Sequence, residues 1–184
     1  MTASPYVHIN AIHQFENTRR RAQLGRWWRR LRRQPQTLLS FADIRGHLPR
    51  TAPRNRGLRE IPLHMIAGSV DRADEFDRNF RPLSDALRHR WVQVRELQEM
   101  VGWEPIDVYQ VGDLYFVQDG HHRVSVARQL GLHSIEAHVR EFPLRAALAP
   151  TDSLAQIIAK VRDARRAAYA PHRPYGCATA CLLG

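Results

Sequence analysis

The chain has 184 residues, of which 43% are hydrophobic and 25% are charged. These proportions are those of a globular domain and exclude a chain that is disordered throughout. Only two cysteines occur, Cys177 and Cys181, so no disulfide framework is expected. The sequence shows neither a signal peptide nor an apolar run of about 18 residues. It therefore predicts a cytoplasmic protein without a membrane span.

The formal net charge of +10 is distributed unevenly along the chain. Residues 1–60 carry a net charge of +10, residues 61–150 carry −3 and residues 151–184 carry +3. A basic arm on a near-neutral core is typical of proteins that bind polyanions. Arginine outnumbers lysine 27 to 1. This bias has two explanations, phosphate recognition by the guanidinium fork or a GC-rich genome.

The first predicted element is a helix over residues 11–33, ended by Pro35. Its apolar residues fall on one stripe at helical spacing, namely Leu24, Trp27, Trp28 and Leu31. Its other faces carry eight arginines, Arg19, Arg20, Arg21, Arg26, Arg29, Arg30, Arg32 and Arg33. We expect this arm to bind DNA or RNA non-specifically. The two tryptophans either stack on bases or anchor the arm to the core, and an anionic membrane surface is a further candidate partner.

A short second helix is expected after Ser40, a good N-cap residue, with Phe41, Ile44 and Leu48 on one side. Residues 49–57 contain two prolines and a glycine and predict a linker. Residues 58–63 predict an edge strand because Pro62 has no amide donor. Apolar residues then recur every three or four positions, which predicts a long amphipathic helix over residues 80–101.

The next segments predict a compact strand-and-helix unit. Strands are expected at residues 105–111 and 114–117, joined through Gly112-Asp113 in a type II′ hairpin turn. A helix follows residues 119–123 and stops at Gly131. The alternation of Ile135, Ala137 and Val139 predicts a strand over residues 134–142. A last helix begins near Thr151 or Asp152.

The chemically informative segment is Asp119-Gly120-His121-His122-Arg123, between a strand and a helix. Gly120 permits a close backbone approach, and the first amides of the helix point outward at the positive end of its dipole. Arg123 adds a bidentate contact to a phosphate, His121 and His122 donate to the same oxygens, and Asp119 orients a histidine or a magnesium ion. The alternative is a tight turn without a ligand.

A metal site is a competing interpretation of the histidines, which are His121, His122, His133 and His138. No carboxylate or cysteine lies at a recognised ligand spacing from them, and Cys177 and Cys181 would need two further ligands. The sequence therefore predicts no metal ion bound directly by the protein.

Five segments carry a recognisable pattern, namely Glu60-Ile-Pro-Leu-His-Met-Ile66, Pro105-Ile-Asp-Val, Val117 to Ala127, Leu130-Gly131 and Ile135-Glu-Ala-His-Val139. Together they resemble the ParB/sulfiredoxin-like superfamily. The resemblance covers about residues 58–142, and the flank over residues 11–56 looks like that of poorly characterised bacterial proteins carrying this domain. It implies an α+β domain with a small mixed sheet and helices, preceded by the basic arm and followed by one helix.

The function must be read residue by residue, because members of the superfamily share the fold but not the activity. Sulfiredoxins have a nucleophilic cysteine at the position of His121, so that activity is excluded. Partition-type ParB proteins hold cytidine triphosphate at the equivalent turn, but after residue 142 the chain is too short for their DNA-recognition and dimerisation domains. The free-serine kinases of the superfamily share the aspartate-glycine-histidine-x-arginine pattern, with an upstream acid as base. The candidate acids here are Asp71, Asp74, Glu75 and Asp77.

The sequence thus predicts an arm and linker over residues 1–57, a ParB/sulfiredoxin-like domain over 58–145, and a helix and tail over 146–184. The expected function is a regulatory module that binds a nucleoside triphosphate, with or without Mg²⁺, at Gly120, His121, His122 and Arg123. Nucleic acid would bind the arm. The alternative is an enzyme, either a small phosphotransferase that uses Asp119 and one of the upstream acids, or a nuclease or ATPase. The nucleotide, any acceptor and the oligomeric state stay open.

Overall fold

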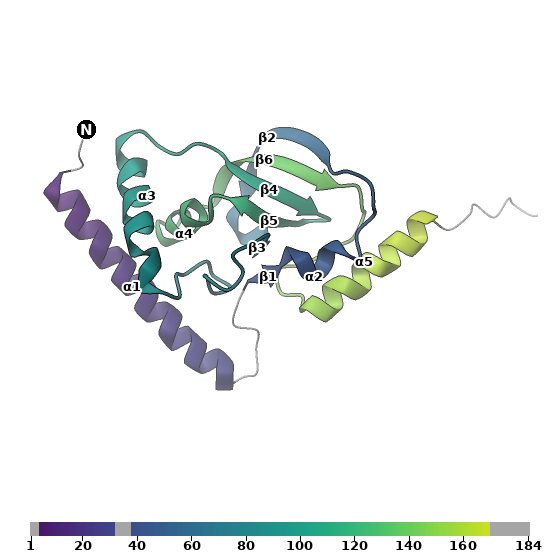
Figure 1. Cartoon of the computed structure of the whole chain (residues 1–184), viewed down its shortest axis with the longest axis horizontal. Coiled ribbons are helices and arrows are strands. Elements are labelled where there is room, and N and C mark those ends of the chain that lie inside the picture. Colours follow the sequence, from purple (N-terminus) through teal and green to yellow (C-terminus); the bar gives the residue numbers. More distant parts are fainter. Residues whose placement is uncertain (1–3, 32–37, 170–184) are drawn as a thin grey trace, which may run out of the picture.

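The computed structural model describes residues 4–31 and 38–169 (Figure 1). Its centre is a mixed six-stranded sheet with the strand order β1-β3-β5-β4-β6-β2. The strands are β1 (Leu39–Ser40), β2 (Arg54–Pro62), β3 (Ile66–Ser69), β4 (Ile106–Val111), β5 (Leu114–Asp119) and β6 (Ser134–Phe142). Neighbours β1/β3, β3/β5 and β4/β6 are parallel, whereas β2/β6 and β4/β5 are antiparallel. This sheet and its helices confirm the predicted α+β class.

The β4–β5 hairpin is the local feature that the sequence predicted best. Val111 pairs with Leu114 across the two-residue link, and Gly112 has a φ of 55°. A Cβ at Gly112 would lie 2.2 Å from the carbonyl oxygen of Ala146. Only glycine therefore fits both the turn and the passing chain.

Helices cover both faces of the sheet (Figure 1). They are α1 (Pro5–Leu31), α2 (Phe41–Arg45), α3 (Arg88–Met100), α4 (His121–Gln129) and α5 (Leu154–Tyr169). On one face α4 packs against the strands, and α3 and α1 pack outside it. On the other face α2 and α5 bury Ile44, Ile157 and Val161. Within the described ranges, no helix combines the length and the apolar character needed to cross a membrane.

The predicted helix over residues 80–101 is shorter than expected. A 3₁₀ turn, η2 (Asp85–Leu87), leads directly into α3, and Phe80 has a φ of 57°, outside the helical region. The Asp77 carboxylate accepts hydrogen bonds from the backbone N–H groups of Asn79 and Arg81. These bonds stabilise a turn where the apolar spacing predicted helix.

The basic arm forms a longer helix than expected, and its described part buries a stripe closer to the N-terminus. The buried residues among the described side chains of α1 are Ala11, Phe15, Thr18 and Ala22, of which Ala11 and Phe15 pack with α3, whereas Leu24 is 65% exposed. The side chains of Trp27, Trp28 and Leu31 lie outside the described part, as do Cys177 and Cys181. Leu24, the one member of the predicted apolar stripe whose side chain is described, therefore lies on the surface and not in the core.

Strand β2 begins at Arg54, within the predicted linker, and lies at one edge of the sheet as expected. Strand β1 forms the opposite edge by pairing with β3, so residues 39–40 also belong to the sheet. The short helix α2 follows Ser40 as predicted and buries Phe41 and Ile44. The sheet therefore includes residues that precede residue 58, the predicted start of the domain.

Candidate functional site

The candidate site lies where β5 passes into α4, at the turn singled out in the sequence. Gly120 connects the two elements with φ 101° and ψ 20°. A Cβ at Gly120 would lie 2.4 Å from Cγ2 of Ile106, so the turn requires glycine for both its conformation and its packing. The first helical hydrogen bond runs from the Val124 N–H to the Gly120 carbonyl at 3.0 Å.

The backbone N–H groups at residues 121–123 precede that first helical bond. They form the positive end of a nine-residue helix. A cavity of about 390 Å³ opens at this end. Its lining residues are Arg72, Ala86, Leu87, Arg90, Val94, Asp119, Gly120, His121, His122 and Arg123. The structure therefore brings the predicted turn residues together around one cavity and adds two arginines to them.

His121 is buried and is held by the sheet. Its Nε2 lies 2.7 Å from Oγ of Ser69 at the end of β3, and its ring also bonds to the backbone of Val117. Ser69 Oγ in turn accepts a hydrogen bond from the Arg72 N–H. Burial lowers the pKa of His121 to about 4, so this side chain is neutral at pH 7. His121 therefore fixes α4 to β3 through a neutral ring.

His122 is also buried, with 8% of its surface exposed. Burial, with smaller contributions from the cations Arg72 and Arg90, lowers its pKa to about 4. Its Nδ1 has no hydrogen-bond partner among the described residues. Buried polar atoms are nearly always paired, so His122 differs in this respect from His121, whose Nε2 lies beside Ser69.

The Arg123 guanidinium is directed toward the protein itself. Its Nη1 donates to the carbonyl oxygens of Glu104 and Pro105 at 2.7 and 2.8 Å, and its Nη2 donates to the Asp119 carboxylate. These bonds fasten the turn to the start of β4. The sequence did not identify Arg72 and Arg90 as site residues because they belong to segments far from the motif and carry no pattern of their own.

The upstream acids proposed as a kinase base lie in different surroundings. Asp71 is exposed, and its Oδ1 lies 3.9 Å from Nε2 of His121. Glu75 lies 3.5 Å from Arg72, and Asp74 is exposed. Asp77 is buried in the turn before α3. Of these carboxylates, the structure places Asp71 beside a site histidine.

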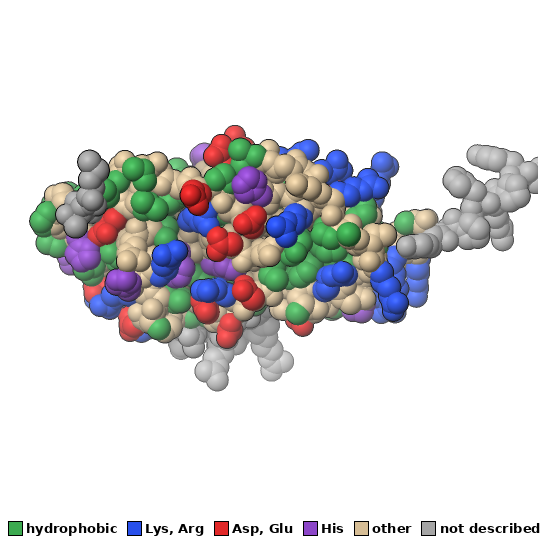
Figure 2. All heavy atoms as spheres, turned by 45° about the horizontal axis from the view of Figure 1, so that its top comes forward, with side chains coloured by type: hydrophobic (Ala, Val, Ile, Leu, Met, Phe, Trp, Pro, Cys, Tyr) green, Lys and Arg blue, Asp and Glu red, His purple; other side chains and the backbone are tan. Residues whose placement is uncertain are grey.

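The arm arginines are described only in part. Arg19 pairs with Asp85 at 2.5 Å, Arg20 and Arg21 lie on the surface, and the side chains of Arg26, Arg29, Arg30, Arg32 and Arg33 lie outside the described part. Figure 2 shows acidic and basic side chains mixed over the middle of one face, with basic ones gathered near the end of α5. In the described ranges, no three His, Cys, Asp or Glu side chains form a group able to hold a metal ion.

The solved structures that are similar to this chain include a sulfiredoxin and a ParB protein. The sulfiredoxin of Arabidopsis thaliana has 26% identity over 46% of this chain and 84% of its own, with a TM-score of 0.34. The C-terminally truncated chromosome-partitioning protein ParB of Caulobacter crescentus, complexed with CTP-gamma-S, has 19% identity over 61% of this chain and 53% of its own, also with a TM-score of 0.34. No family model and no curated protein matches the chain.

Proposed function

We propose that this protein is a regulatory module that binds a nucleoside triphosphate at the N-terminus of α4. The observation that carries the proposal is the cavity at this helix N-terminus, which His122 lines together with Arg72 and Arg90. A phosphate group in this cavity would contact the N–H groups at residues 121–123 and add negative charge beside the two cations.

The cavity offers separate surfaces to the two ends of a nucleotide. The N–H groups at residues 121–123 and the guanidinium groups of Arg72 and Arg90 suit phosphate oxygens. Ala86, Leu87 and Val94 supply apolar surface for the base or the sugar. Asp119 is an exposed carboxylate at the same turn and would contact a Mg²⁺ ion carried by the phosphates.

In this proposal Arg123 shapes the turn as well as adding positive charge. Its bonds to the carbonyls of Glu104 and Pro105 hold β4 beside Gly120. Replacing Arg123 would therefore disturb the turn and the binding together. Arg90 is exposed, so its replacement tests phosphate binding with less effect on the fold.

We further assign the basic arm to non-specific binding of nucleic acid. The eight arginines between residues 19 and 33 support this assignment through their charge alone. Each phosphate that they neutralise releases counterions, so the affinity would fall steeply with salt. Loss of duplex DNA binding in Arg20→Gln/Arg21→Gln at low salt would support it, and unchanged binding would refute it.

A small phosphotransferase is the second candidate, because Asp71 Oδ1 lies 3.9 Å from Nε2 of His121, a residue that lines the cavity. In such an enzyme Asp71 would accept the proton of an acceptor hydroxyl as the phosphoryl group transfers. Release of ADP that requires an acceptor and is lost in Asp71→Asn would favour the enzyme. Nucleotide binding without turnover would favour the regulatory module.

The deciding experiment is calorimetric titration of the full chain with ATP, ADP, CTP and GTP in the presence of Mg²⁺. Arg90→Gln is compared with Arg145→Gln, which removes an exposed arginine outside the cavity. A charged hydrogen bond contributes about 1.5–3 kcal/mol, so we expect Arg90→Gln to weaken binding by about 10- to 100-fold. Equal affinities for the two variants would refute a site at α4.

A further inference from the structure

A second and larger cavity lies at the opposite end of α4. Its volume is about 660 Å³, and it shares no lining residue with the cavity at the N-terminus of the helix. It is bounded by the 3₁₀ turn η1 (Leu63–Met65), the loop at Arg78, the end of α4 and the loop before α5. Arg128 follows His121 by seven residues, about 10 Å along the helix axis. The two cavities are therefore separate.

All ionisable side chains that line this cavity are basic. They belong to His64, Arg78, Arg128 and His133, and the buried carboxylate of Asp77 acts on Arg128 from outside the lining. This composition is unusual for its part of the chain, because residues 61–150 carry a net charge of −3. The cavity therefore presents positive charge to whatever enters it.

Arg128 is held at the base of the cavity. Its Nη2 donates to the carbonyl oxygens of Leu63 and Ile66 at 2.6 and 2.8 Å, and its guanidinium lies 4.9 Å from the ring centroid of Phe80. Burial lowers the pKa of Arg128 to about 10, so the group keeps its charge at neutral pH. A fixed cation thus lies beside the cavity.

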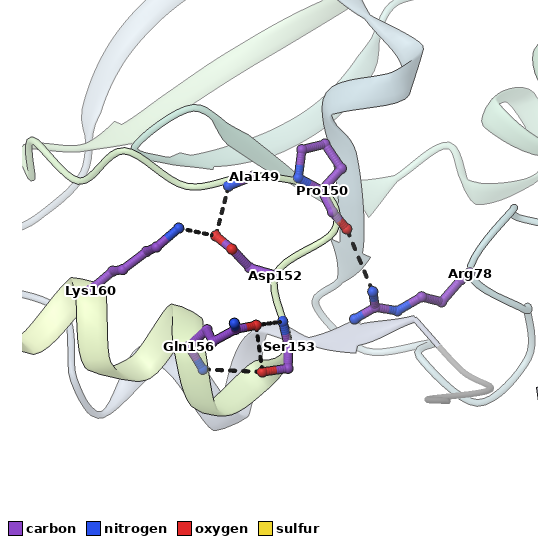
Figure 3. A network of polar contacts seen from close by, with 7 residues as sticks. All are labelled: Arg78, Ala149, Pro150, Asp152, Ser153, Gln156 and Lys160. Carbon is purple, nitrogen blue, oxygen red and sulfur yellow. Dashed lines mark hydrogen bonds and ion pairs between the residues drawn. The ribbon is translucent and has the colours of Figure 1, made fainter. Parts of the chain in front are cut away.

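The opposite wall is held by the polar network in Figure 3. Arg78 extends across to Pro150, whose carbonyl oxygen lies 3.5 Å from Nη1. Asp152 accepts hydrogen bonds from Lys160 and the Ala149 N–H, so its charge is already paired. Ser153 and Gln156 cap α5 by bonding to each other. The wall is therefore ordered before any ligand binds.

The remaining lining residues are partly apolar and partly neutral polar. The apolar ones are Leu63, Ile66, Ala67, Leu132 and Pro150, and the polar ones are Asn79, Thr151 and Ser153. Cavities that bind small molecules typically measure about 300–1,000 Å³ and combine apolar walls with a few polar groups. This cavity has that size and that combination. Its chemistry suits a ligand with an apolar body and one anionic group.

We propose that this cavity binds a small organic anion, with its phosphate or carboxylate group beside Arg78 and Arg128 and its apolar body against Leu132 and Pro150. The ligand is distinct from the nucleotide proposed for the other end of α4, and neither proposal depends on the other.

The test uses phenyl phosphate and phenylacetate as probes and benzyl alcohol as the uncharged control. Each is titrated into the full ¹⁵N-labelled chain and followed by amide chemical shifts. We expect saturable shifts at Leu132, Thr151 and Ser153 with at least one anion and none with benzyl alcohol. The anion that binds identifies the charged group. Shifts confined to residues 121–123, equal binding of benzyl alcohol, or no saturable binding of either anion would overturn the proposal.

Two leucine variants provide the matched comparison. Leu132→Glu places a negative charge at the cavity, whereas Leu97→Glu places the same charge on α3, and the two residues are 43% and 47% exposed. Both variants should fold, since each replaces a partly exposed side chain. We expect Leu132→Glu to weaken binding of the anion at least tenfold and Leu97→Glu to leave it unchanged. Equal affinities in the two variants would refute the assignment.

Discussion

Acidification from pH 7 to pH 5 is expected to destabilise the protein through His121 and His122. Burial lowers the pKa of each from 6.5 to about 4. In the unfolded chain both side chains regain their ordinary pKa and bind protons as the pH falls through 6.5. The free energy of unfolding is therefore highest above pH 6.5 and decreases as the pH falls toward 4.

The magnitude follows from the size of the pKa shift. One pKa unit corresponds to about 1.4 kcal/mol, and at pH 5 the unfolded histidine is protonated while the folded one is not. The free energy of unfolding should therefore fall by about 2 kcal/mol for each histidine between pH 7 and pH 5. The two together amount to about 4 kcal/mol, a large share of the stability of a typical domain.

Urea unfolding of the wild type and of His122→Leu, each at pH 7 and pH 5, measures this effect. We expect the wild type to lose about 2 kcal/mol more than the variant over this range, because the variant has one buried histidine fewer. NMR titration of the imidazole groups gives an independent measurement of both pKa values. Titration midpoints near 6.5, or the same pH dependence in both proteins, would contradict the reasoning.

Two further substitutions test the packing on which the site depends. Gly120→Ala should lower the free energy of unfolding by about 1–3 kcal/mol and weaken nucleotide binding, because the new Cβ would clash with Ile106. Gly131→Ala is the control, since Gly131 also has a positive φ but a Cβ there meets nothing within 4 Å. Equal urea midpoints for the two variants would contradict this prediction. Phe15→Ala should lower the free energy of unfolding by about 3–5 kcal/mol, because this fully buried ring packs against Trp91, with 5.8 Å between the two ring centroids. The exposed Leu24→Ala should change stability by less than about 0.5 kcal/mol, and an equal effect of both changes would show that α1 is not docked.

The segment from β4 to β6 could be predicted from the sequence because its signals are local. Strand alternation and the Gly112 turn specify a hairpin, and Gly120 marks the passage from strand to helix. The pattern of Ile135, Ala137 and Val139 correctly predicted the buried face of β6. These features depend on neighbours within a few residues of one another.

The errors arose where the prediction rested on apolar spacing alone. Apolar spacing extended the predicted helix back to Phe80, where the hydrogen bonds of Asp77 stabilise a turn instead. The arm buries Phe15 because Trp91, on a segment far along the chain, provides its partner. Periodicity identifies a possible apolar face but not the surface against which it packs.

The sequence by itself determined the turn at Gly120 and its position ahead of a helix, because backbone conformation there depends on local residues. Only the tertiary structure determined the environment of that turn. Folding buries His121 and His122 and brings Arg72 and Arg90 to the same cavity. Burial and charge are sums over neighbours from the whole chain, so the pKa values of the histidines and the chemistry of the cavity follow from the fold.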